Sequence, residues 1–195
     1  MARRPRKQIT LDDPRAIRAL SHPARLTVID ELYSGRVATS TELAALTGLT
    51  PSAMSYHMRA LEKLGIVERD ESATDGRERP WRAAGKGLTF APLTTRAQHA
   101  AANVLTDAIL QAHQQELQAY VEAEPDLPQP WQGKGVLNTS SEYLTAEETQ
   151  QLIDALYAAA EPFRQKAKRR SGRGKRAGQK SRRVRVTFLV VPIVE

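Results

Sequence analysis

Polar side chains that could read another molecule gather between residues 50 and 59. They are Thr50, Ser52, Ser55, Tyr56, His57 and Arg59. Thr50 followed by Pro51 is typical of a helix N-cap and its first helical position, so we expect a helix to begin here. Small hydroxyl groups let a helix approach DNA closely and hydrogen-bond to bases or phosphates. We therefore interpret these residues as a DNA-contacting face; the alternative is an ordinary exposed helix, which would more often be rich in Glu and Lys.

Two helices and a turn must position this face. Met54, Met58 and Leu61 fall on one side of the predicted helix, at the spacing of a buried face. Before this helix, residues 42–46 predict a short apolar helix that ends at Gly48, because glycine readily adopts the left-handed conformation of a sharp turn. This arrangement predicts a helix-turn-helix, whose second helix enters the major groove of DNA.

A hairpin is predicted directly after the second helix. Residues 66–69 and 79–82 indicate two strands, and the Asp75-Gly76 pair between them is a hairpin-turn signal. Arg77 and Arg79 lie near the tip, where they could reach phosphates or a minor groove; a solvated turn is the alternative. We expect Trp81 to pack on the helical core rather than to stack on a base.

These segments resemble the ArsR-type winged helix-turn-helix repressors of bacteria. The similar stretches are residues 20–29 (LSHPARLTVI), 52–58 (SAMSYHM) and 61–67 (LEKLGIV). The resemblance covers residues 11–90, less than half of the chain. It implies a winged helix fold, and it implies that Ser52, Ser55, Tyr56 and His57 contact operator DNA.

Many members of that family bind metals through cysteine thiolates, which this sequence does not permit. It contains no cysteine, so it forms no thiolate site and no disulfide, a composition that fits a reducing cytoplasm. Other candidate ligands lie on a predicted long helix, namely His99, Asp107, His113 and Glu116. Their spacing is wider than the pairs that zinc usually needs, so we interpret them as a solvated surface and predict no metal and no cofactor.

The net charge of +7 is unevenly distributed along the chain. Residues 164–185 hold 12 Lys or Arg and no acid, residues 91–163 hold 2 basic and 10 acidic residues, and residues 11–90 are balanced. We expect the basic segment 164–185 to include a loop that is either a solvated tether or an arm tracking phosphates. No apolar run could span a membrane and no secretory signal is recognisable, so we expect a cytoplasmic protein.

The second half of the chain predicts assembly elements. Residues 94–122 indicate a long helix with a thin apolar stripe formed by Ala101, Leu105, Ala108, Ile109, Ala112 and Leu117. Such a helix needs a partner, and we expect a twofold copy of itself together with the helix predicted at residues 12–20. Residues 145–168 predict a further helix, flanked by predicted strands at 135–144 and 184–194. This small β-α-β region could bind an unidentified small-molecule effector.

These features predict an α+β, mostly helical fold with a winged helix-turn-helix domain at residues 11–90 and a dimerisation region at residues 94–195. We find no phosphate-binding loop, dinucleotide fingerprint or nucleophile elbow, so we do not expect an enzyme. We predict a dimeric bacterial transcriptional regulator, a repressor, that binds an inverted repeat in double-stranded DNA. The alternatives are a non-specific architectural nucleic-acid-binding protein driven by the basic segment, and an interaction scaffold that has lost DNA binding.

Overall fold

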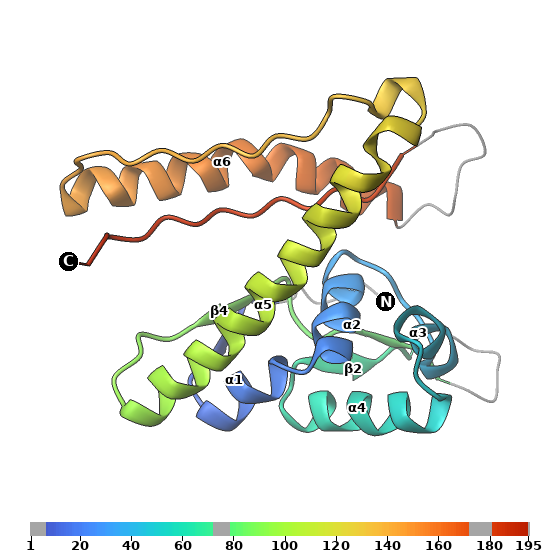
Figure 1. Cartoon of the computed structure of the whole chain (residues 1–195). Helices are drawn as coiled ribbons and strands as arrows, with labels where there is room; N and C mark the ends of the chain where they lie inside the picture. The colour runs from blue at the N-terminus through green and yellow to red at the C-terminus, as the bar shows by residue number, and fades with distance from the viewer. Residues whose placement is uncertain (1–6, 72–78, 172–180, 195) are drawn as a thin grey trace. The chain divides into compact units, whose positions relative to one another are not determined.

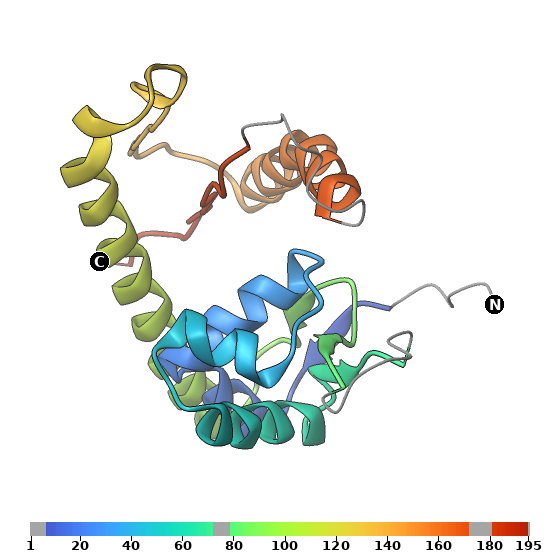
Figure 2. The same ribbon diagram turned by 90° about the vertical axis from the view of Figure 1, so that its right-hand side faces the viewer.

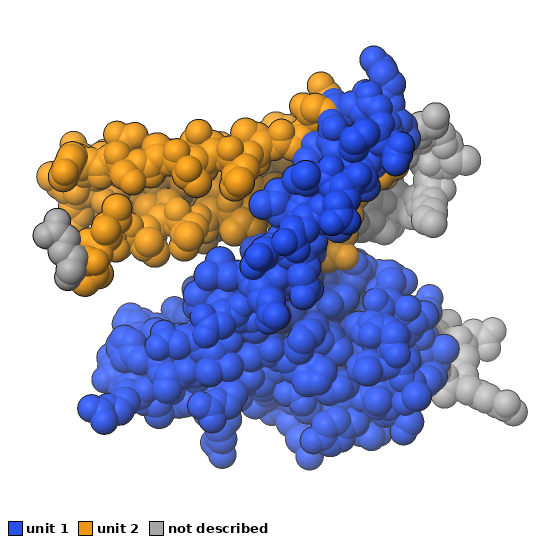
Figure 3. Space-filling model, in the orientation of Figure 1, with its two compact units in different colours: residues 1–132 blue, residues 133–195 orange. Residues whose placement is uncertain are grey.

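The structure is a computed structural model that describes residues 7–71, 79–171 and 181–194. The chain divides into two compact units, unit 1 at residues 1–132 and unit 2 at residues 133–195 (Figure 3). Its described elements, in chain order, are β1 (Ile9–Leu11), α1 (Pro14–Leu20), α2 (Pro23–Tyr33), α3 (Ser40–Thr47), α4 (Pro51–Lys63), β2 (Val67–Arg69), β3 (Trp81–Ala83), β4 (Leu88–Phe90), α5 (Arg96–Ala123), two 3-10 turns (Glu124–Asp126 and Gln129–Trp131) and α6 (Ala146–Ser171) (Figure 1). The fold is α+β and mostly helical, as predicted.

The helix-turn-helix forms from α3 and α4 with the local signals that the sequence indicated. A capping box begins α3, because Thr39 and Glu42 satisfy each other's backbone N–H groups. Gly48 ends α3 with a φ of 69°, a left-handed conformation that favours glycine. The Thr50 hydroxyl then accepts a hydrogen bond from the Ala53 N–H at 3.2 Å and caps α4.

A short antiparallel sheet follows α4. Strands β2 and β3 pair with Val67 opposite Ala83, and Ala38 adds an isolated antiparallel bridge to Trp81. The Tyr33 hydroxyl of α2 donates to the Ile66 carbonyl at 2.8 Å and ties this sheet to the helices. The predicted hairpin strands are therefore confirmed. The predicted turn at Asp75-Gly76 lies outside the described residues.

A second small sheet in unit 1 was not predicted. Strands β1 and β4 pair in parallel, with Ile9 opposite Leu88. A Cβ at Gly85 would stand 2.7 Å from both the Ile9 side chain and the Lys7 carbonyl, so glycine permits the close approach of the chain to β1.

The hydrophobic core of the described residues lies wholly in unit 1. It joins α1–α4, the β2–β3 sheet and the first half of α5. Trp81 is completely buried, and its indole N–H donates to the hydroxyl of buried Ser40 at 2.9 Å. The prediction that Trp81 packs on the helical core is confirmed.

The long predicted helix is present as α5, but its apolar stripe has a different role from the one we expected. The Gln98 side chain caps α5 at Thr95 and also donates to the Asp12 carbonyl at 2.8 Å, next to α1. Ala101 and Leu105 are buried in the core of their own chain, where α5 packs on α1. These two residues are therefore not available to a partner chain.

Unit 2 contains the predicted helix but not the predicted strands. Thr145 and Glu148 form a capping box at the start of α6, as the sequence indicated. The predicted β-α-β arrangement is not formed in the described residues, because neither 135–144 nor 184–194 contributes a strand to the two sheets found there. A high β propensity makes a segment suitable for a sheet but does not supply the neighbouring edge. None of the described helices is apolar over a length that would cross a bilayer.

The buried Trp81–Ser40 hydrogen bond gives a stability test. Ser40→Ala should lower the free energy of unfolding by about 1–3 kcal/mol, because the indole N–H loses its buried acceptor. In a Trp81→Phe background no donor remains, so the same change should cost about 1 kcal/mol less. Denaturant unfolding of the four proteins measures this coupling; an equal cost of Ser40→Ala in both backgrounds would contradict it.

Candidate nucleic-acid interface

The geometry of α4 separates a buried side from an open side. Met54, Met58 and Leu61 are fully buried and hold the helix against the core. Figures 1 and 2 show α4 along the edge of unit 1, so the opposite side of the helix faces outward from that unit. This packing fixes which residues of α4 another molecule can reach.

Predicted contact residues lie together on that open side. Ser52, Ser55, Tyr56 and Arg59 recur at three- and four-residue intervals, so they form one stripe along α4, which we call the outer stripe. Tyr56 is 62% exposed, Ser52 and Arg59 are also exposed, and Ser55 is half-buried. Lys63 extends the stripe by one turn and is exposed. The sequence analysis missed Lys63, although its position four residues after Arg59 indicates the same face.

Thr50 has a local structural role at the start of this stripe. Its hydroxyl is engaged as the α4 cap, and its backbone is extended. The first turn of α4 carries no acidic residue, so the positive end of the helix dipole is not neutralised there. Such a helix start favours an anion, for example a DNA phosphate.

His57 does not lie on the outer stripe; its side chain contacts residues at the start of α2. Its Nδ1 accepts a hydrogen bond from the Arg25 Nε at 3.2 Å, and its ring lies 4.4 Å from the His22 ring, centroid to centroid. The Arg25 Nη1 also donates to the Ala19 carbonyl at 3.1 Å, at the end of α1. Arg25 therefore links α1, α2 and α4, and this contact orients the helix that carries the outer stripe.

The electrostatics of this cluster favour a neutral His57. Partial burial is the largest cause that lowers the pKa of His57, and the electrostatic effects of His22 and Arg25 lower it further. With Nδ1 accepting from Arg25, the neutral ring carries its proton on Nε2. The sequence stretch SHPAR indicated a family resemblance but not this contact, which spans 32 residues.

Some arginines of the β2–β3 hairpin have side chains that contact the protein itself, and one has a side chain exposed to solvent. The Arg69 guanidinium lies 3.5 Å from the centre of the Trp81 ring, and its Nη1 donates to the Arg79 carbonyl. Arg82 pairs with Glu68 at 2.8 Å and faces the buried Asp70 at 3.6 Å. Arg79 is exposed, as a DNA contact requires. Arg77, the other predicted contact, lies outside the described residues.

The described residues also include no group of three His, Asp or Glu side chains that could hold a metal ion. His113 and Glu116, the two candidate ligands on α5 that are nearest in sequence, belong to no such group.

Comparison with known families supports the geometric description. Residues 20–70 match a family described as a helix-turn-helix domain. This segment is a helix-turn-helix domain. The match spans α2, α3, α4 and β2, so it includes the outer stripe and Arg25, but it covers about a quarter of the chain. No curated protein matches the sequence.

Several solved structures of regulators are similar to the chain at low identity. Wild-type ZitR of Lactococcus lactis in complex with DNA is 17% identical over 72% of this chain and 74% of that chain, with a TM-score of 0.32. Apo MarR from E. coli is 18% identical over 75% and 87%, with a TM-score of 0.32. A transcriptional regulator homologue from Pyrococcus horikoshii is 25% identical over 51% and 87%, with a TM-score of 0.30. Scores at this level do not establish a common fold over the aligned residues.

The Arg25–His57 contact predicts a lowered pKa of His57, which can be measured. The pKa of His57, followed by NMR of its ring protons, should lie below the ordinary value of about 6.5. Arg25→Met should raise that pKa, because it removes a positive neighbour and the hydrogen bond to neutral Nδ1. Arg36→Met, at a guanidinium that pairs with Glu31 instead, should leave it unchanged.

The same shift has a consequence for stability. Unfolded His57 takes up its proton at a higher pH than folded His57 does, so the unfolded state binds more protons between the two values. The free energy of unfolding should therefore fall as the pH drops below about 6.5 and level off below the folded pKa. A His57 pKa at or above the ordinary value would contradict the described contact.

Proposed function

We propose that this protein is a sequence-specific DNA-binding transcriptional regulator that acts as a homodimer. The observation that carries this proposal is the outer stripe of α4, an exposed row of hydroxyl and basic side chains on a helix whose other side is fully buried. A helix held this way can enter a major groove without disturbing the core. The helix-turn-helix match over residues 20–70 supports the same conclusion.

The side chains of the interface divide by the contacts they can make. Ser52, Ser55 and Tyr56 offer hydroxyl donors and acceptors to base edges, where sequence is read. Arg59, Lys63 and Arg79 offer charges to phosphates, which position the protein without reading sequence. Because residues 11–90 carry balanced charge, affinity for DNA depends on this local placement rather than on net charge.

Dimerisation would use the side of α5 that the core leaves open. Leu110, Leu117 and Val121 recur at seven- and four-residue intervals on the side opposite Leu105, and they are 45%, 40% and 63% exposed. A twofold contact along this second stripe would hold two copies of α4 against two half-sites of an inverted repeat. Binding both half-sites at once raises affinity without any new contact to DNA.

We further propose that the regulator represses its target and works in the bacterial cytoplasm. The support is the ArsR-type resemblance of residues 11–90, together with the absence of cysteine from the whole chain. A dimer bound across an inverted repeat occupies promoter DNA and excludes other proteins from it. A small-molecule effector, if one acts, would have to change the spacing or order of the two α4 helices.

The outer stripe predicts weaker operator binding at unchanged stability. Ser55→Ala combined with Tyr56→Ala should weaken operator binding by about 1–3 kcal/mol for each base that the variant no longer touches. Thermal unfolding should stay near the wild-type midpoint, because Tyr56 is exposed and neither residue is in the core. Ser141→Ala combined with Tyr143→Ala removes the same groups from exposed positions in unit 2 and is the matched control. Unchanged operator affinity in the folded Ser55/Tyr56 variant would contradict the assignment.

The exposed stripe of α5 predicts how assembly controls binding. Leu110→Glu combined with Leu117→Glu should produce monomers in light scattering and weaken operator binding by about 100-fold, because the avidity of two half-sites is lost. Gln111→Glu combined with Gln115→Glu adds the same charge on other sides of α5 and should leave both properties unchanged. A wild-type protein that is monomeric at micromolar concentration would overturn the dimer.

A specific observation favours one second candidate, the architectural nucleic-acid-binding protein. The basic segment 164–185 carries 12 positive charges, enough for strong salt-dependent binding to any duplex. Residues 172–180 of this segment lie outside the described residues. Competition between operator and random DNA separates the candidates: a regulator should prefer its operator by about 10³-fold or more, and an architectural protein should not.

A further inference from the structure

Unit 2 presents apolar side chains that no core of its own covers. All buried hydrophobic residues of the described chain lie between Leu11 and Leu105, in unit 1. Among the described side chains of unit 2, large hydrophobic residues remain exposed on α6 and on the extended segment 181–194. A helix and one extended segment make half of a layered core, which is stable only when another layer covers it.

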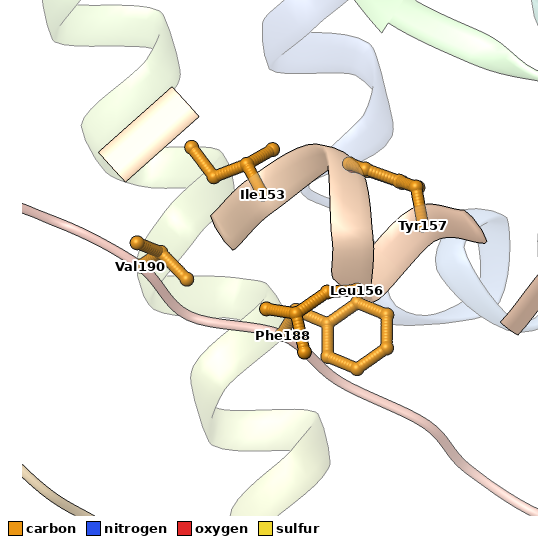
Figure 4. A pocket seen from close by; sticks show the side chains of 5 residues that line it. All are labelled: Ile153, Leu156, Tyr157, Phe188 and Val190. Atoms are coloured by element: carbon orange, nitrogen blue, oxygen red, sulfur yellow. The ribbon is translucent and has the colours of Figure 1, made fainter. Parts of the chain in front are cut away.

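In the described part of unit 2, α6 and the extended segment 181–194 pack against each other. Phe188 meets Tyr157 edge-on, with ring centroids 6.3 Å apart. Both residues line a shallow cleft of about 140 Å³, together with Ile153, Leu156 and Val190 (Figure 4). Phe188 lies near Tyr157, and Val190 lies near Ile153 (Figure 4). Segment 181–194 therefore runs antiparallel to α6, as the ribbon in Figure 1 shows. The even-numbered residues 188 and 190 therefore face the helix.

The other side of this segment is apolar as well. Leu189, Val191 and Ile193 alternate with the residues that face α6, and they are 68%, 63% and 78% exposed. A strand that is apolar on both sides is typical of one buried between two layers. The exposed row spans residues 189–193 on the side away from the cleft, so a small molecule that filled the cleft would leave this row uncovered.

The charges of unit 2 indicate what covers it. Residues 146–163 of α6 are acidic, with Glu147, Glu148, Asp154 and Glu161 and no basic residue. Its later part carries Arg164 and Lys166, and the antiparallel segment brings Arg182, Arg183 and Arg185 to that same basic end. Unit 2 is therefore polarised, with one acidic end and one basic end.

We propose that unit 2 is an interaction surface for a second copy of the chain, docked antiparallel about a twofold axis over Leu189, Val191 and Ile193. A twofold operation brings the acidic end of each copy to the basic end of the other, so the polarised surface is complementary to itself. The contact buries the outward apolar row and completes the missing layer. It adds an interface to the homodimer of the proposed function, but it requires neither DNA binding nor the α5 stripe.

The natural absence of cysteine allows a site-specific test in the full-length protein. Single cysteines are introduced at each position from 184 to 193, and disulfide-linked dimers are followed under mild oxidation without DNA. The proposal predicts fast cross-linking around one centre, strongest at outward positions such as Leu189→Cys. Ala45→Cys, at an exposed position on α3, is the matched control and should cross-link at least about tenfold more slowly.

Charge reversal tests the antiparallel orientation. Arg182→Glu with Arg183→Glu, added to Leu189→Cys, should slow cross-linking by about tenfold, because the five residues named at the basic end fall from a charge of +5 to +1 and the two new carboxylates face the acidic end of the other copy. Both arginines lie outside α6, so circular dichroism should show undiminished helix. Adding Glu147→Lys and Asp154→Lys supplies two positive charges for the two new carboxylates of the other copy and should restore the rate to within about twofold.

Two results would overturn the proposal. One is cross-linking along 184–193 no faster than at Ala45→Cys, which would mean that another part of the chain, or nothing, covers this surface. The other is cross-linking that the charge reversals leave unchanged, which would exclude the antiparallel arrangement. If either result is obtained while operator binding is intact, the interface in unit 2 is wrong but the proposed function stands. If cross-linking is fast but the protein shows no preference for its operator, the proposed function is wrong but the interface stands.

Discussion

Burial of one side of α4 is the constraint on which the rest of the structure depends. Met54, Met58 and Leu61 are completely inaccessible to solvent, and burying side chains of this size contributes about 1.5–3 kcal/mol each. This packing sets the rotation of α4 about its own axis. It therefore determines that Ser52, Tyr56 and Arg59 face outward. A rotation of α4 by one residue would move the outer stripe out of this exposed position.

Polar contacts at the start, near the middle and beyond the end of α4 reinforce that orientation. Thr50 caps its start, and Arg25 holds His57 near its middle while also binding the end of α1. Beyond the end of α4, Tyr33 binds the Ile66 carbonyl and Ser40 binds Trp81, so the β2–β3 sheet is tied to α2 and α3. The interface is therefore presented by a rigid scaffold, which favours selective binding because little order is lost on association.

Local signals made the helix-turn-helix predictable from sequence. The Thr50-Pro51 start, the Gly48 turn and the spacing of Met54 and Met58 all lie within a dozen residues and indicate the same structure. Long-range contacts were not predictable in this way. The pairing of Ile9 with Leu88 joins two three-residue strands, and the position of His57 depends on Arg25 in another helix.

Two expectations for the second half of the chain failed for one physical reason. An apolar pattern shows that a side must be covered, but it does not identify the cover. Leu105 was assigned to a partner chain, and the structure buries it against α1 of the same chain. Residues 184–194 were assigned to a sheet on their alternating pattern, and the structure places them in neither of the two sheets of the described residues. The candidate DNA contacts were easier to place, because the apolar pattern of α4 shows which side of this helix is buried, and its polar residues on the opposite side must then be exposed.

Selection of bound DNA from a random pool tests the central claim most directly, because it requires no knowledge of the operator. The full-length protein is mixed with random duplexes at physiological salt, and the retained DNA is amplified and sequenced over several rounds. A dimer that reads DNA with α4 should enrich an inverted repeat whose half-site centres lie about 10 base pairs, one helical turn, apart. Retained DNA with no shared motif would contradict sequence-specific recognition, and a single enriched half-site without its inverted copy would contradict the dimer.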